Sequence, residues 1–121
     1  MAVHRIYPDR RTLHGHFSLN LEPVLTIESG DTVIFQTLDS AWRSVVDREY
    51  VPFRDRTDRP EDQGHALCGP VAIKGAKPGM VLEILIGDIR PGPKGRTGGG
   101  SGTWQADKLK ALGYMGESDT P

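Results

Sequence analysis

The chain has 121 residues, a formal net charge of −1 and a single cysteine. A domain of this length buries roughly two thirds of its unfolded surface and needs neither disulfide nor metal to fold, and one cysteine excludes an internal disulfide. The near-neutral charge argues against nucleic acid as a partner, and no apolar run approaches the roughly 18 residues of a membrane span. Because the N-terminus lacks the apolar segment of a signal peptide, we expect a cytoplasmic protein that binds neither nucleic acid nor membranes.

Fifteen glycines and nine prolines favour a turn-rich β protein over a helical one. We predict a short edge strand over residues 3–7 and a second strand over residues 13–21. Alternation along the second strand places His14 and His16 on the same, more polar face.

The clearest hairpin signal follows. Residues 24–28 and 32–38 read as two strands, and Ser29-Gly30-Asp31 reads as the turn between them. Both faces of the second strand are largely apolar, which is typical of the core of a β-sandwich or barrel.

From residue 39 to residue 63 the alternation ends, and arginines interleave with acidic residues. A loop of this length is uncommon inside a compact domain unless it is functional or mobile. Within it, residues 41–50 are compatible with either a short helix or a short strand. The arginines could clamp a carboxylate bidentately, but the interleaved acids favour a solvated loop.

The stretch from residue 64 to residue 88 reads as strand, tight turn, strand. Residues 71–74 and 80–86 are the two extended runs, and Pro78-Gly79 suits the centre of a type II turn. The segment leading in, Gly64–Pro70, holds His65 and Cys68 among two glycines and a proline. Polar chemistry at the mouth of a rigid hairpin is a candidate site, although many plain loops are built in the same way.

The rest of the chain has linker composition, with glycines and prolines from residue 91 to residue 102. Residues 104–112 are predicted to form one short helix that ends before Gly113. We therefore expect a mainly β domain over residues 1–92, sandwich-like or barrel-like. Residues 93–121 would add a glycine-rich linker, the short C-terminal helix and a flexible tail.

His65 and Cys68 allow more than one interpretation. If a metal binds, His16 and His65 are the expected ligands with Asp39 as an oxygen ligand, but a histidine in a glycine loop often only ties backbone together. Cys68 as a nucleophile would need a base and a lowered pKa, and a lone cysteine is usually buried and inert. No histidine follows Cys68, which argues against a blue copper site.

Three stretches, in order along the chain, together resemble the acetamidase/formamidase family. They are Pro23–Val33 (PVLTIESGDTV), the strand end Thr37–Asp39, and Gly64–Val71 (GHALCGPV) with the following GAKPG and LEI. The resemblance covers about Leu13 to Pro91, and His16, a few residues before Pro23, stands where family members often have a histidine. It implies a β-rich fold and hydrolysis of small amides such as formamide or acetamide, assisted by a divalent metal (zinc, manganese or calcium).

Carried over by position, the resemblance implies that His16, Asp39 and His65 line the site as metal ligands. His65 or Asp39 would also act as general base, and the Gly64, Cys68 and Gly69 positions would contact the substrate. Family enzymes are much longer, so the chain resembles only the N-terminal portion of one, truncated. We expect it to form a homo-oligomer or to pair with a complementary second half. The alternative function is a non-catalytic β module acting in self-association or small-ligand binding.

Overall fold

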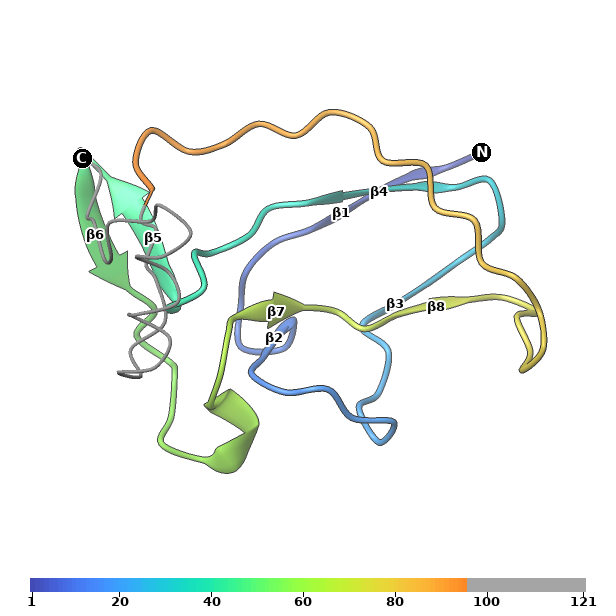
Figure 1. The fold of residues 1–121 in the computed structure, drawn as a ribbon, viewed down its shortest axis with the longest axis horizontal. Helices are drawn as coiled ribbons and strands as arrows, with labels where there is room; N and C mark the ends of the chain where they lie inside the picture. The colour runs from blue at the N-terminus through green and yellow to red at the C-terminus, as the bar shows by residue number, and fades with distance from the viewer. Residues whose placement is uncertain (96–121) are drawn as a thin grey trace, which may run out of the picture. The chain divides into compact units, whose positions relative to one another are not determined.

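A computed structural model describes residues 1–95 of the chain, and these residues form short strands joined by turns (Figure 1). The mainly β class predicted from the sequence is confirmed, and the one helix in this range is the single 3-10 turn η1 (Pro60–Asp62). The predicted helix over residues 104–112 lies outside the described residues. The strands are β1 (Val3–Ile6), β2 (Leu13–His14), β3 (Leu25–Ile27), β4 (Thr32–Phe35), β5 (Arg43–Val46), β6 (Glu49–Pro52), β7 (Leu67–Cys68) and β8 (Val71–Ile73).

These strands pair two by two into four small sheets, and in the described part of the chain they do not close into a barrel. Strand β1 pairs in parallel with β4, and β3 pairs in parallel with β8. Strand β2 pairs antiparallel with β7, and β5 pairs with β6. Figure 1 shows β1 beside β4 and β3 beside β8. Partners far apart in sequence therefore hold the fold together.

The predicted hairpin over residues 24–38 is wrong, because β3 and β4 pair with other strands and not with each other. The turn itself is present: Asp31 N–H donates to Glu28 O at 3.1 Å, and Gly30 has a φ of +91°. A positive φ at the third position is the mark of a type II turn, whose twist splays the flanking strands instead of pairing them.

Two other strand predictions are also wrong. The run over residues 13–21 is a strand only at β2, and Phe17 and Leu19 are fully exposed, at 92% and 104%. Residues 80–86 do not form a strand. The Pro78-Gly79 turn that precedes them is confirmed, since Met80 N–H donates to Lys77 O at 3.2 Å and Gly79 has a φ of +91°.

Residues 41–50, for which the sequence left helix and strand open, contribute to the β5–β6 hairpin. Asp47 and Arg48 both have positive φ, of 49° and 66°. Two consecutive positive φ values make a type I′ turn, the turn that suits a two-residue hairpin loop. The described chain divides into two compact units, residues 1–44 with 50–88, and a second that includes residues 45–49 and 89–95.

The buried core of the described residues is small. Ile6 of β1, Leu13 of β2 and Trp42 are the buried hydrophobic side chains, with exposures of 3%, 3% and 1%, and Thr12 and Asp62 are buried polar residues beside them. Within residues 1–95 no helix has the length and apolar character required to cross a membrane.

Candidate functional site

The segment that carries His65 and Cys68 is held against the segment that carries His14 and His16. Strands β2 and β7 pair with Leu13 opposite Cys68 and His14 opposite Leu67. Gly69 N–H donates to Thr12 O at 2.9 Å, which extends the pairing by one residue. The two polar segments singled out from the sequence are therefore neighbours in space.

Beyond this pairing the two backbones come still closer, at Gly15 and Gly64. A Cβ atom on Gly64 would lie 2.5 Å from Gly15 O, and a Cβ atom on Gly15 would overlap the carbonyl group of Gln63. Gly64 also has a φ of +88°, which side-chain-bearing residues rarely adopt. Only glycine fits at both positions, and His16 and His65 each follow one of these glycines directly.

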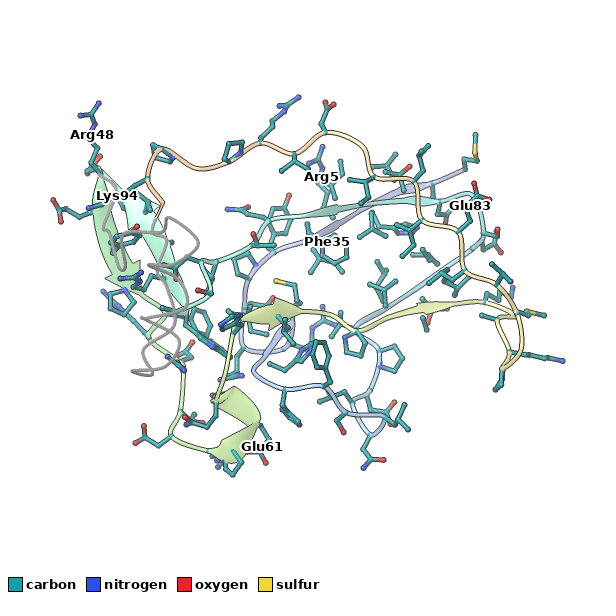
Figure 2. All side chains as sticks on the ribbon, viewed as in Figure 1. Arg5, Phe35, Arg48, Glu61, Glu83 and Lys94 are labelled. Atoms are coloured by element: carbon teal, nitrogen blue, oxygen red, sulfur yellow. The ribbon has the colours of Figure 1, made fainter. Side chains whose placement is uncertain are left out.

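The imidazole of His16 is partly oriented by the backbone of η1. Its Nδ1 lies 3.1 Å from the carbonyl oxygen of Glu61, which Figure 2 shows on the loop carrying η1. A carbonyl oxygen only accepts hydrogen bonds, so in neutral His16 the proton resides on Nδ1 and the lone pair on Nε2. His65 is exposed and makes no hydrogen bond to any part of residues 1–95.

His14, which the sequence placed on the same face as His16 but not in the site, has a pKa below its ordinary value. Partial burial is the main cause, and the charge of His16 adds to it. Burial also raises the pKa of the Cys68 thiol, with a further contribution from the Asp9 carboxylate. A thiol with a raised pKa forms little thiolate and is a poor nucleophile, in agreement with the inert interpretation of Cys68.

Asp39 is fully engaged in hydrogen bonds. Its Oδ1 accepts from the N–H groups of Ala41 and Arg43 at 3.0 and 2.8 Å, and its Oδ2 accepts from Arg43 Nε and Nη2 at 2.9 and 2.6 Å. The Arg43 guanidinium also lies 3.9 Å from the centroid of the Tyr50 ring. Four donors occupy the acceptor positions of the carboxylate, so it has none left for a metal ion.

Asp39 nevertheless begins a segment that reaches the site. The next residue, Ser40, accepts a hydrogen bond from Ala66 N–H at 3.3 Å, and Trp42 Nε1 donates to Gly64 O at 2.9 Å. The three segments carrying the predicted metal ligands thus meet through their backbones. Among residues 1–95, however, no three His, Cys, Asp or Glu side chains form a group able to hold a metal ion.

Asp62, two residues before Gly64, belongs to a charged cluster that the sequence did not reveal. Arg10 forms a bidentate ion pair with Asp62. Thr57 donates to the same carboxylate through its N–H and its hydroxyl, at 2.7 and 2.9 Å. The guanidinium groups of Arg10 and Arg56 lie 5.7 and 5.1 Å from the ring centroid of Trp42. This cluster anchors the irregular loop from residue 53 to residue 63.

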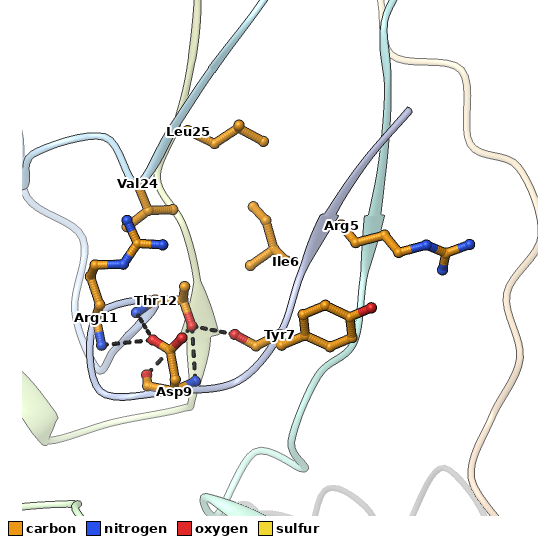
Figure 3. A pocket seen from close by; sticks show the side chains of 8 residues that line it. All are labelled: Arg5, Ile6, Tyr7, Asp9, Arg11, Thr12, Val24 and Leu25. Atoms are coloured by element: carbon orange, nitrogen blue, oxygen red, sulfur yellow. Dashed lines mark hydrogen bonds between the residues drawn. The ribbon is translucent and has the colours of Figure 1, made fainter. Parts of the chain in front are cut away.

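One small pocket, of about 150 Å³, lies beside β1 and the start of β3 (Figure 3). Thr12 Oγ1 donates to Tyr7 O and accepts from Asp9 N–H, which closes the turn at one end of the pocket. Figure 3 shows Arg11 extending alongside Val24. The pocket is lined by Arg5, Ile6, Tyr7, Asp9, Arg11, Thr12, Val24 and Leu25, and thus by none of the residues predicted for the site.

Comparison with known proteins bears on the interpretation of this geometry. The family model described as Acetamidase/Formamidase family matches residues 3–117. The match extends on both sides of the stretch from Leu13 to Pro91 that carried the sequence resemblance. Neither the search of curated proteins nor that of solved structures gives a match.

Proposed function

Because the chain belongs to the acetamidase/formamidase family, we propose that it binds a small linear amide and hydrolyses it to a carboxylic acid and ammonia. The family match over residues 3–117 is the observation that carries this proposal. The close approach of Gly15 and Gly64 supports placing amide hydrolysis beside these two glycines, since His16 and His65 follow them on adjoining backbone segments.

In this proposal the Nε2 atom of His16 is the general base. Its lone pair is free because Nδ1–H is directed at Glu61 O. Nε2 takes a proton from water as the water oxygen attacks the amide carbonyl carbon. The C–N bond then breaks, and a proton is delivered to the departing nitrogen; we assign this role to protonated His65, which follows Gly64 in the adjoining segment. General acid–base catalysis of this kind contributes typically 10²–10⁴-fold in rate.

The backbone beside the two histidines offers donors for the developing oxyanion. Within residues 1–95, the N–H groups of Gly64 and His65 have no acceptor. Consecutive backbone N–H groups aimed at a tetrahedral oxyanion stabilise it more than the ground-state carbonyl. We assign the amide oxygen to this position, which gives Gly64 a role in substrate binding as well as in close packing.

The predicted divalent metal fits this arrangement poorly. Asp39 would have to give up at least one of its four hydrogen bonds, two of which come from the charged Arg43 side chain. We therefore assign no step of the reaction to a metal. Elemental analysis of the purified parent and of the Arg43→Ala variant tests whether a metal binds. Only in the variant does Asp39 Oδ2 lose its two Arg43 donors. A stoichiometric metal in the parent that is lost in His65→Ala would contradict our assignment.

The function is tested by measuring ammonia release from formamide and from acetamide with the purified full chain. We expect activity in the parent and a loss of at least about tenfold in His16→Ala and in His65→Ala. Leu19→Ala is the matched control, since Leu19 is fully exposed at 104% and should leave the rate unchanged. No ammonia from the folded parent with either amide, or unchanged rates in both histidine variants, would overturn the proposal.

A second candidate function is a non-catalytic β module whose role is self-association. The observation in its favour is the exposed apolar run of residues 80–86, each large hydrophobic side chain of which is at least 62% exposed. A folded parent that associates with itself but neither hydrolyses nor binds amides would favour this second function over the first.

A further inference from the structure

The orientation of the His16 ring depends on one backbone carbonyl group, that of Glu61 in η1. Its oxygen lies 3.1 Å from His16 Nδ1 and also accepts a hydrogen bond from Gly15 N–H at 2.6 Å. A carbonyl oxygen has two lone pairs, so two consecutive residues of one segment use both. The tautomer of a neutral histidine is set by the hydrogen bond that one of its ring nitrogens makes. The position of this carbonyl group therefore decides whether the free lone pair of the imidazole lies on Nε2.

The turn η1 has few hydrogen bonds of its own with which to hold that carbonyl group in place. It is a single 3-10 turn of three residues, and its N-cap residue Arg59 makes no side-chain capping hydrogen bond. Asp62 N–H donates to Arg59 O at 3.0 Å, and Gln63 N–H donates to Pro60 O at 3.2 Å. A helix this short is marginal in water without tertiary contacts. Contacts from outside η1 must therefore fix the carbonyl group.

The side chain of Arg10 makes such contacts on both sides. Asp62, the last residue of η1, is 2% exposed, and its two carboxylate oxygens accept from Arg10 Nη1 and Nη2 at 2.6 and 2.7 Å. The same Nη2 donates to Leu13 O of β2 at 3.1 Å, and Nη1 donates to Asp55 O at 2.8 Å. Leu13 lies three residues before His16. One planar guanidinium thus binds both the segment that carries the imidazole and the turn that carries the carbonyl group.

We propose that Arg10 is a positioning residue for His16. By holding β2 and η1 together, its guanidinium keeps the Glu61 carbonyl group at Nδ1 of the imidazole and leaves the free lone pair on Nε2. Arg10 acts through the backbone, since its hydrogen bonds go to the two segments and to the Asp62 carboxylate, not to the imidazole. The inference rests on the proposed function only for the catalytic role of Nε2, because the position of the ring is a property of the free protein.

Nitrogen NMR of the histidine rings in the substrate-free full chain tests the proposal, at a pH of about 8, where an ordinary histidine is neutral. Couplings between ring nitrogens and ring protons distinguish the two tautomers, and His16→Gln identifies the signals of His16. We expect the Nδ1–H tautomer in the parent, and both tautomers in Arg10→Ala and Arg10→Lys. A guanidinium is a rigid planar fork, whereas a lysine ammonium is a single point charge. Arg10→Lys therefore keeps a charge beside Asp62 but does not span both segments.

Two control variants separate positioning from a general loss of stability. Arg11→Lys makes the same substitution at the next residue, whose exposed side chain makes no hydrogen bond to any part of residues 1–95. Gly75→Ala strains the backbone at a φ of +81°, at a place where a Cβ atom meets nothing within 4 Å. Both controls should keep the tautomer of the parent. If Arg10→Ala does not fold, Arg10→Lys decides, because it leaves the buried Asp62 carboxylate with a cationic partner.

Three results would overturn the positioning role of Arg10: an Nε2–H tautomer of His16 in the parent, a parental tautomer in the folded Arg10 variants, or an equal change in Gly75→Ala. The NMR measurement needs no substrate, so its failure is distinct from failure of the amidase function. With formamide or acetamide, kcat of Arg10→Lys should fall by about ten- to a hundredfold while KM changes less. A parental kcat in a variant with an altered tautomer would contradict Nε2 as the base, and with it the proposed mechanism.

Discussion

The guanidinium of Arg10 donates to both carboxylate oxygens of Asp62, at 2.6 and 2.7 Å, across 52 positions of sequence. The Asp62 side chain is only 3% exposed and the Arg10 side chain is 41% exposed. The pair joins the turn before β2 to the end of η1, and η1 leads directly into the Gly64–His65 segment. Its strength therefore bears on both the stability of the fold and the geometry of the candidate site.

Removing one partner of this pair should destabilise the fold. In Arg10→Ala the buried Asp62 carboxylate keeps Thr57 but loses its charged partner, and we expect a loss of about 2–3 kcal/mol in the free energy of unfolding. Urea denaturation measures it. Arg54→Ala, a change at an exposed residue of the neighbouring loop, is the control and should cost less than about 0.5 kcal/mol. Equal stability of the two variants would show that the ion pair contributes nothing.

The same contact makes stability depend on pH. The Arg10 hydrogen bond lowers the pKa of Asp62 from 3.8 to about 2, despite the opposing effect of burial. A carboxyl group with a lower pKa in the folded chain stabilises the fold fully above its unfolded pKa, and this contribution is lost as pH falls from about 4 towards 2. We expect the urea midpoint to fall over that range in the parent, and to fall less in Asp62→Asn.

Asp31 should contribute to the same acid sensitivity. Hydrogen bonds from Ala2 N–H, the His4 side chain and Glu28 N–H hold its pKa far below the ordinary value. Its carboxylate ties the N-terminal residues of β1 to the turn before β4. If Asp62 alone caused the acid sensitivity, Asp31→Asn would leave the pH profile unchanged; we expect it to flatten the profile as well.

Gly64 and Gly75 offer a matched pair of substitutions. Both have positive φ, of 88° and 81°, but a Cβ on Gly64 would lie 2.5 Å from Gly15 O, whereas one on Gly75 meets nothing within 4 Å. Gly75→Ala should therefore cost about 1–2 kcal/mol, the strain of the backbone conformation alone. Gly64→Ala adds a clash between backbones and should cost clearly more, as thermal denaturation would measure. Similar losses in the two variants would contradict the close approach.

Trp42 should act on the site through the backbone of Gly64. Trp42→Phe keeps most of the buried ring but removes the 2.9 Å hydrogen bond from Nε1 to Gly64 O. We expect a stability loss of about 0.5–1.5 kcal/mol, the net contribution of the lost hydrogen bond. If the amidase proposal holds, kcat should fall while KM changes less. A variant with parental stability and parental kcat would show that this hydrogen bond does not position the segment.

Several local features could be predicted from residue types alone. Gly30 and Gly79 occupy turn positions that need positive φ, and the chain does turn at both. Short extended runs with β-branched residues became β1, β3, β4 and β8. The ordered motifs from Pro23 to Ile84 were sufficient to identify the family, which the match over residues 3–117 confirms. These features depend on a few neighbouring residues, and so the sequence carries them directly.

Pairing was decided by tertiary structure. The turn at Gly30 suggested a hairpin, but β4 pairs with β1 and β3 with β8, because a type II turn splays its strands and longer-range partners were available. The alternation after Leu13 predicted a strand over residues 13–21, yet the strand ends at His14, and Phe17 and Leu19 are exposed. A period of two shows which residues share a face but not which strand lies alongside.

The candidate site, like the fold, was determined partly by local residue types and partly by tertiary contacts. The sequence by itself determined that histidines and glycines occur together around Gly15 and Gly64, and which family such a pattern belongs to. Only the tertiary structure decided that these glycine backbones touch and that Arg43 occupies the carboxylate of Asp39. It likewise decided that Arg10 crosses 52 positions to reach Asp62. Such contacts arise from chain closure between distant segments, and no local pattern of residue types encodes them.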